Sequence, residues 1–234
     1  MCTLGAKKIG SFFLIKSRDP LEGYEHGASV ELVDAAVRKL LVKNSDGVYG
    51  GVNSFGVGVI VSSVKDKGEE SKGCFIGNCV PALLDARTAE EALEMLEEMD
   101  AFCCGNVMIA DPANCYVAEW CGSEVSIEDV SLRAVRTNHF VSLSHGPESR
   151  KEYPSSFRRF DRALELIRSA NSVEDLQQLL KNHEAGPSEL SICRHGEKNT
   201  TGAFIIDTRN RRIMYCEGHP CEGSFESFSI DKQN

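Results

Sequence analysis

Cys2 is the residue of this sequence with the most reactive chemistry, and it stands between Met1 and Thr3. Because aminopeptidases remove an initiator methionine that precedes a small residue, we expect Cys2 to carry a free α-amine beside its thiol. An α-amine titrates near pH ~8, so part of it can accept a proton at neutral pH. A deprotonated thiol is a strong nucleophile. One residue could therefore supply both the nucleophile and the general base.

A thiol that attacks a carbonyl needs suitable neighbours. Hydrogen-bond donors must stabilise the oxyanion, a polar group must hold the α-amine near the thiol, and a cation must lower the pKa of the thiol. Arg18 and Asp19 follow the first apolar segment, where Arg18 could polarise the thiol and Asp19 could hold the ammonium. The alternative for this pair is an ordinary surface ion pair in a turn.

Two asparagines are candidates for the oxyanion site. Asn53 lies in the segment Gly-Val-Asn-Ser-Phe-Gly, where turn geometry alone could account for it. Asn138 lies in the polar run Thr-Asn-His at the end of a predicted strand. Arg194 and His195 precede another strand, and His139 and His195 could line the site or be structural histidines.

The composition excludes several classes of function. The net charge of -9 and the pI of about 5.2 argue against a nucleic-acid partner, because phosphate binding needs a basic face. No apolar run has the length of a membrane span, and no signal-peptide cleavage site follows residues 11–15. We therefore expect a cytoplasmic protein. If Cys2 is the nucleophile, the expected partner is a small-molecule acyl amide or thioester. The oligomeric state is left open, a homo-oligomer included.

The ten cysteines do not form a standard metal motif. No C-x-x-C occurs, and pairs such as Cys216 and Cys221 lack the usual zinc spacing. In a reducing compartment we expect most of these residues to be buried free thiols. We predict no metal and no cofactor, with a zinc or thiol-redox protein as an alternative.

Hydrophobic periodicity predicts the elements that must position these residues. Strands are expected over 11–16, 57–61, 107–110, 116–120, within 133–141, and over 203–207 and 212–216. Helices are expected over 29–43, 81–99 and 156–170, and from residue 172. Thr88 and Ser172 stand where N-caps are expected.

Strands at both ends of the chain, with helices between them and no regular βαβ alternation, favour an α+β fold of two helix-covered sheets. The chain shows neither repeats nor a linker. We therefore predict a single domain over residues 1–234, with residues 225–234 as a loose tail.

The order of the polar motifs resembles that of the N-terminal nucleophile (Ntn) hydrolases. The closest resemblance is to the acyl-CoA:6-aminopenicillanic acid acyltransferase family of cysteine peptidases, with choloylglycine hydrolases and penicillin V acylase as more distant relatives. It runs from residue 2 to about residue 222. The motifs that carry it are Cys2, Arg18-Asp19, Gly-Val-Asn-Ser-Phe-Gly, Thr-Asn-His-Phe, Cys-Arg-His-Gly and Gly-His-Pro-Cys.

This resemblance implies a four-layer αββα sandwich of two antiparallel sheets, with Cys2 as nucleophile and its α-amine as base. It also implies Arg18 and Asp19 beside the thiol, Asn138 as oxyanion donor, and Asn53 and Arg194 in the same site. The family commonly has Arg-Asn-x-Asp where this chain has Arg18-Asp19-Pro20. The penicillin acyltransferase of this family is cut internally before its cysteine, whereas for this chain we expect trimming of Met1 to suffice.

Three hypotheses for the function follow. The first is an amidase that cleaves a non-peptide C–N bond through an acyl-enzyme on Cys2, or an acyltransferase that passes the acyl group to an amine. The second is an inactive binding protein that retains the fold. The third is the zinc or redox protein named above.

Overall fold

The computed structural model describes residues 2–20, 27–64, 75–99, 103–146, 149–183 and 186–231, and Met1 lies outside them. These residues form two antiparallel sheets. The first has the order β10 (Arg133–Arg136), β1 (Leu4–Ile9), β2 (Ser11–Arg18), β11 (Gly202–Asp207), β12 (Arg212–Glu217) and β13 (Glu226–Ser229). The second has the order β3 (Ser29–Val33), β4 (Lys39–Asn44), β5 (Gly47–Asn53), β6 (Gly58–Ser63), β7 (Cys104–Ala110), β8 (Cys115–Cys121) and β9 (Glu124–Asp129).

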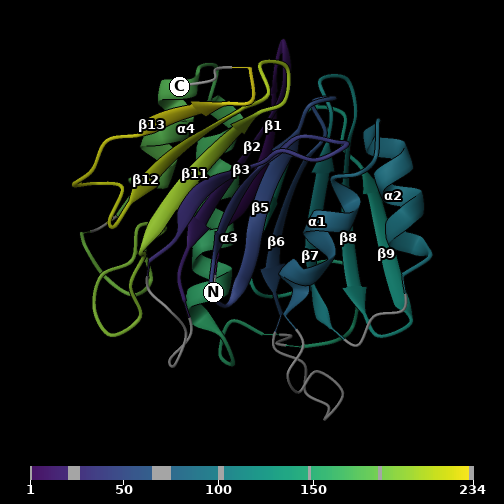
Figure 1. Cartoon of the computed structure of the whole chain (residues 1–234). Helices are drawn as coiled ribbons and strands as arrows, with labels where there is room; N and C mark the ends of the chain where they lie inside the picture. The colour runs from purple at the N-terminus through teal and green to yellow at the C-terminus, as the bar shows by residue number, and fades with distance from the viewer. Residues whose placement is uncertain are drawn as a thin grey trace.

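Helices cover the outer face of each sheet (Figure 1). A 3-10 turn, η1 (Ile76–Cys79), leads into α1 (Val80–Leu83), which together with α2 (Ala89–Glu97) packs on the β3–β9 sheet. The other sheet carries α3 (Pro154–Ser169) and α4 (Val173–Leu180). The predicted four-layer sandwich is confirmed. No helix of the described part of the chain is long and apolar enough to cross a membrane.

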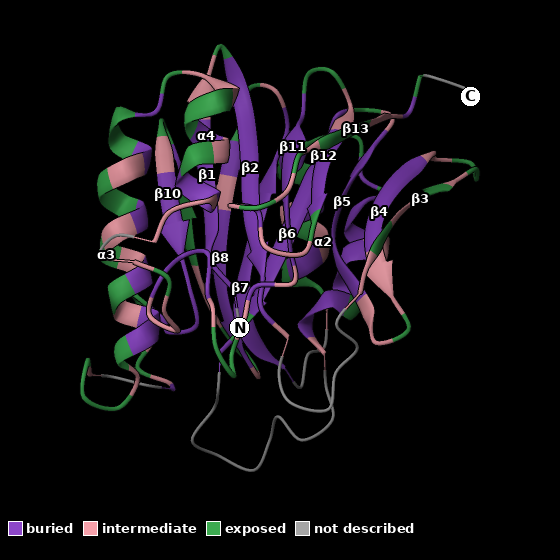
Figure 2. Cartoon of the chain, turned by 90° about the vertical axis from the view of Figure 1, so that its left-hand side faces the viewer, coloured by how far each residue is buried: buried purple, intermediate pink, exposed green. Residues whose placement is uncertain are grey.

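Strand β2 is central to its sheet and buried along its whole length, which explains its run of four apolar residues over 12–15 (Figure 2). Successive side chains of a strand point to opposite faces. Phe12 and Leu14 pack between the two sheets, and Phe13 and Ile15 pack beneath α3 and α4. The next even-numbered residues, 16 and 18, therefore carry their positive charges into the space between the sheets.

Three predictions about the elements are wrong. Residues 29–43, expected as a helix, form β3 and β4, which pair with Val30 opposite Val42. Their valines favour strands, and an apolar spacing that fits a helix can also fit two strand faces. The expected helix over 81–99 is divided into α1 and α2. The expected loose tail is wrong for residues 226–229, because β13 pairs with β12.

Both predicted N-caps are confirmed. Thr88 accepts a hydrogen bond from the Glu91 N–H at 3.1 Å, and Ser172 forms a reciprocal capping box with Asp175. These caps satisfy N–H groups that have no partner within the helix. They fix where α2 and α4 begin.

Three described cysteines, Cys103, Cys104 and Cys121, are disulfide-bonded and depart from the expectation of free thiols. Cys104 and Cys121 face each other across β7 and β8 and form a disulfide. Six other described cysteines are free, namely Cys2, Cys79, Cys115, Cys193, Cys216 and Cys221. Five of these six are buried, in line with the expectation.

A buried carboxylate on β8 ties the two sheets together. The Glu119 carboxylate accepts the Arg136 Nε–H at 2.8 Å and three main-chain N–H groups of residues 141–143 at 2.7–3.0 Å. Arg136 ends β10 in the other sheet, and the acceptor side chain is only 1% exposed. These contacts therefore fix both ends of the segment that contains Asn138.

We expect Glu119→Gln to lower the free energy of unfolding by about 3 kcal/mol, because it removes the buried negative charge that accepts Arg136 and three main-chain N–H groups. Glu128→Gln is the matched control. Glu128 pairs with the same arginine at 2.7 Å, but its side chain is 48% exposed, so a loss below about 1 kcal/mol is expected. Urea denaturation measures both, and equal losses would contradict this account.

Candidate active site

Hydrogen bonds hold the main chain of Cys2 on both sides. Its nitrogen donates to Asn138 Oδ1 at 3.0 Å, and its carbonyl oxygen accepts from Arg159 Nη1 at 2.8 Å. Asn138 follows β10, whereas Arg159 lies on α3. Cys2 itself is only 8% exposed. The α-nitrogen and the thiol are thus placed inside the sandwich by two separate elements.

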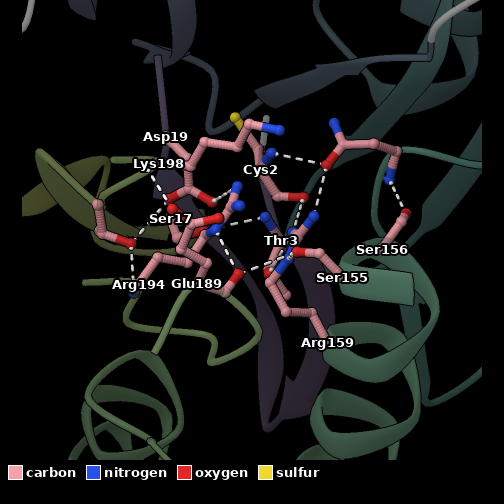
Figure 3. A network of polar contacts seen from close by, with 12 residues as sticks. Cys2, Thr3, Ser17, Asp19, Ser155, Ser156, Arg159, Glu189, Arg194 and Lys198 are labelled. Carbon is pink, nitrogen blue, oxygen red and sulfur yellow. Dashed lines mark hydrogen bonds and ion pairs between the residues drawn. The ribbon is translucent and has the colours of Figure 1, made fainter. Parts of the chain in front are cut away.

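The orientation of the Asn138 amide is fixed by its partners. Arg159 Nη2 donates to Oδ1 at 2.8 Å, and because a guanidinium only donates, the acceptor must be the amide oxygen. The amide nitrogen donates to the carbonyl oxygen of Ser63 at 2.8 Å. The main-chain N–H of Asn138 donates to Ser156 Oγ at 2.9 Å (Figure 3). The amide oxygen therefore faces the α-nitrogen of Cys2.

A lysine supplies the positive charge beside the thiol. Burial raises the pKa of the Cys2 thiol, whereas the Lys16 ammonium and the main-chain N–H of Asp19 lower it. The lowering effects together are larger, so the pKa of the thiol lies below its ordinary value. Burial in turn lowers the pKa of Lys16, an effect that the Cys2 thiolate partly opposes. Lys16 is 1% exposed and also donates to the carbonyl of Val61. The site thus favours the nucleophilic thiolate.

Asp19 lies on the other side of Cys2 in a buried polar cluster. Its carboxylate accepts the Thr200 hydroxyl at 2.8 Å and lies 3.6 Å from Arg194 Nη1. Arg194 donates through Nε to the carbonyl of Glu189 at 2.8 Å, and its N–H donates to Thr200 Oγ1 at 2.9 Å. Figure 3 shows Asp19 and Arg194 gathered on one side of Cys2, with Arg159 below it. The structure thus brings Cys2, Asp19 and Arg194 together, as the sequence predicts.

Arg18 does not occupy the place expected for it. Its guanidinium lies over the ring of Tyr49, 4.3 Å from the ring centre, and donates to Tyr49 Oη at 2.9 Å and to Thr201 Oγ1 at 2.8 Å. The cation next to the thiol is Lys16, two residues earlier on the same face of β2. Lys16 also stands three residues before Asp19, which is the Arg-to-Asp spacing that the resemblance implies.

The structure does not bring Asn53 to Cys2. Its amide nitrogen donates to the carbonyls of Leu84 and Ala86 at 2.9 and 2.7 Å, and its amide oxygen accepts the N–H groups of Phe55 and Val57. This turn joins β5 to β6 at the end of β6 opposite to Ser63. Asn53 therefore anchors the turn to the segment after α1.

Neither predicted histidine contacts the thiol among the described residues. Burial, followed by the Arg159 charge, lowers the pKa of His139 to about 4, so the ring is neutral at pH 7. His139 stacks on Phe157 at 3.8 Å, and its Nδ1 lies 2.8 Å from Ser156 Oγ. His195 lies in a different cluster, beside His183, Cys193 and Cys221.

The sequence motifs do not point to Lys16 and Arg159, although the position of each residue within its element is unusual for a charged side chain. Lys16 occupies an inward-facing position of a strand whose eight residues are all buried. Arg159 lies four residues before Ala163 and eight before Ile167, on the buried face of α3. A charge at a core position of a strand or helix has to be paired, and such groups gather at functional sites.

Comparison with known proteins identifies the family of this chain. The sequence profile of the family described as acyl-coenzyme A:6-aminopenicillanic acid acyl-transferase matches residues 40–222. The chain belongs to this family. The match begins after β2, so Cys2, Lys16 and Asp19 lie ahead of it. No curated protein matches the chain by sequence.

Several solved structures share the fold of this chain at low sequence identity. Penicillin V acylase from Agrobacterium tumefaciens superposes with a TM-score of 0.63 at 12% identity, over 99% of this chain and 87% of that one. A variant of conjugated bile acid hydrolase from Clostridium perfringens gives 0.65 at 14%, over 100% and 94%. The Caenorhabditis elegans ortholog of N-acylethanolamine-hydrolyzing acid amidase gives 0.64 at 10%, over 98% and 100%. The predicted family, Ntn fold and enzyme class are confirmed.

Lys16→Met should raise the pKa of the Cys2 thiol, because burial remains while the neighbouring ammonium is lost. Each unit of pKa gained lowers the thiolate fraction at pH 7 by about tenfold. The rate of Cys2 alkylation by iodoacetamide across pH, followed by peptide mass spectrometry, measures this change. Arg18→Met is the control, and it should leave the profile unchanged. A profile that shifts in Arg18→Met and not in Lys16→Met would show instead that Arg18 lowers the pKa of the thiol.

Asn53→Ala should lower the free energy of unfolding by about 3 kcal/mol, because it leaves two buried carbonyls and two N–H groups without their partner. The alkylation profile of Cys2 should not change. Asn114→Ala, at an exposed turn residue, serves as the control and should stay within about 0.5 kcal/mol. Slower alkylation of Cys2 in Asn53→Ala at unchanged stability would instead place Asn53 in the site.

Proposed function

We propose that this chain is a cysteine amidohydrolase, active once Met1 is removed, that cleaves a non-peptide C–N amide bond through an acyl-enzyme on Cys2. Its partner in this proposal is a small-molecule acyl amide. One observation carries the proposal, namely that a buried thiol lies beside Lys16 while the nitrogen of the same residue is held by Asn138 Oδ1.

In the first half of the reaction, Sγ of Cys2 attacks the carbonyl carbon and forms a C–S bond, while the α-amine receives the thiol proton. The tetrahedral intermediate then collapses, the C–N bond breaks, and the α-ammonium protonates the departing amine. In the second half, the α-amine removes a proton from water, and the hydroxide attacks the thioester. The carboxylic acid leaves and Cys2 regains its thiol.

The site has an excess of buried positive charge that suits this chemistry. Three basic side chains, Lys16, Arg159 and Arg194, are buried around Cys2 together with one acidic side chain, Asp19. The two anions of the pathway are the thiolate and the tetrahedral oxyanion. Fixed cations in a buried site stabilise such charges more strongly than water does, because they need no reorientation.

Asn138 is the proposed side-chain donor to the oxyanion. One of its two amide N–H groups is used by the Ser63 carbonyl. The second amide N–H group of Asn138 has no acceptor among the described residues. It lies on the same side chain whose oxygen accepts the Cys2 nitrogen. Asp19 and Arg194 act as positioning residues, since the N–H of Asp19 faces the thiol and the guanidinium of Arg194 balances the carboxylate.

Acyl transfer to an amine is the second candidate, and family membership favours it. The two reactions share the acyl-enzyme and differ in whether water or an amine enters the site afterwards. Supplying an acyl-thioester together with a series of amines, and quantifying the free acid and the amide formed, distinguishes them. Amide formation in preference to acid would assign the chain to acyl transfer.

The intact mass of the purified chain should be lower than the encoded mass by one methionine. Incubation with short and long acyl amides or thioesters should then add one acyl group, located on Cys2 and removable by hydroxylamine. Cys2→Ala should abolish both the adduct and turnover, whereas Cys79→Ala, which removes a thiol elsewhere, should retain them. Retention of Met1, or an adduct that persists in Cys2→Ala, would refute the mechanism.

A further inference from the structure

Four potential metal ligands converge at a place that the proposed reaction does not use. They are His183, just after α4, Cys193 and His195 on the loop that precedes β11, and Cys221 after β12. Their ligand atoms all lie within 4.8 Å of one another. Both cysteines are free thiols. Three segments far apart in the sequence thus bring two imidazoles and two thiols together.

The distances within this cluster match those of a tetrahedral site. His195 Nε2 lies 3.1 Å from His183 Nε2, 3.4 Å from Cys221 Sγ and 3.6 Å from Cys193 Sγ. With Zn–N bonds of about 2.0–2.1 Å and Zn–S bonds of about 2.3 Å, a tetrahedron separates two nitrogens by roughly 3.3 Å and nitrogen from sulfur by roughly 3.5 Å. All three distances agree with these edges to within a few tenths of an ångström.

Hydrogen bonding alone does not account for the convergence. The Nε2 atom of an imidazole has a single bonding position, which holds either a proton or a lone pair. Three heteroatoms nevertheless surround the Nε2 of His195 within 3.6 Å. A cation at the centre of the four groups would satisfy all of them at once.

We propose that His183, Cys193, His195 and Cys221 bind one Zn²⁺ ion in a closed, structural site. Two thiolates and two imidazoles are a soft tetrahedral ligand set that suits this ion. On binding, each thiol releases one proton to solvent and the histidines remain neutral, so the occupied site has no net charge. His219 stacks on the ring of His195 at 4.0 Å and covers the site.

The site has a direct structural connection to the proposed active site. Two of its ligands, Cys193 and His195, flank Arg194, whose guanidinium lies 3.6 Å from Asp19. The main chain supports this loop through the Cys193 N–H, which donates to the Asn182 carbonyl at 3.1 Å next to His183. A bound ion would therefore connect the loop that carries Arg194 to the end of α4 and to the turn after β12.

Metal analysis of the purified chain tests the proposal without any substrate. Protein prepared under reducing conditions without chelator should contain about one zinc ion per chain. Removing the zinc and adding Co²⁺ should give the intense visible bands of tetrahedral cobalt, together with a sulfur-to-cobalt charge-transfer band. Stripping the zinc should also lower the melting temperature, and adding Zn²⁺ should restore it.

Cys221→Ser and His183→Ala should each lose most of the zinc and weaken the cobalt bands. Per cobalt ion that remains bound, only the cysteine variant should have a weaker charge-transfer band, because it alone loses a thiolate ligand. Cys79→Ala removes a free thiol outside the cluster and should retain one zinc ion. Circular dichroism shows whether each variant is folded. The proposal is overturned if the wild-type chain binds neither Zn²⁺ nor Co²⁺, if Cys193 and Cys221 are joined as a disulfide under these conditions, or if a folded ligand variant retains full zinc.

Discussion

The structure depends on holding the α-nitrogen of Cys2 inside a protein sandwich, where water cannot solvate it freely. A buried polar group without a partner is costly, so this nitrogen requires a fixed acceptor. Asn138 Oδ1 is that acceptor, and Arg159 binds the same oxygen and the Cys2 carbonyl. Glu119 in turn holds the segment around Asn138 from the other sheet. A chain of hydrogen bonds thus extends from the candidate nucleophile through both sheets.

Electrostatics explains why so many charged groups are buried here. Burial alone would keep the Cys2 thiol protonated, and only cations close to it reverse that effect. Lys16 provides the nearest charge, but its own desolvation weakens its hold on the proton. Asp19 and Arg194 compensate each other nearby. The result is a buried site around Cys2 in which basic side chains outnumber acidic ones.

The sequence alone predicts much of this arrangement and fails for identifiable reasons. The order of the motifs predicts that Cys2, Asp19 and Asn138 lie together. It does not place Asn53, because a glycine-rich turn selects asparagine for its geometry as readily as for catalysis. It does not indicate Lys16 either, because Arg18, two residues later, fits the expected residue type better. Lys16 and Arg18 lie on the same face of β2, so only their contacts across the sheets, to Val61 and Cys2 for Lys16 and to Tyr49 and Thr201 for Arg18, decide which of the two cations reaches the thiol.

The loop around Arg194 shows why short spacing rules miss long-range sites. His183 and Cys221 are separated by two strands in sequence, yet they meet because β11 and β12 form a hairpin that returns to the end of α4. No local motif encodes that return. If a metal ion closes this cluster, the geometry of Arg194 and the charge balance at Asp19 depend on the ion without any contact between the ion and the substrate. The loop that carries Arg194 would then gain its rigidity from the ion, because no helix or strand includes that loop.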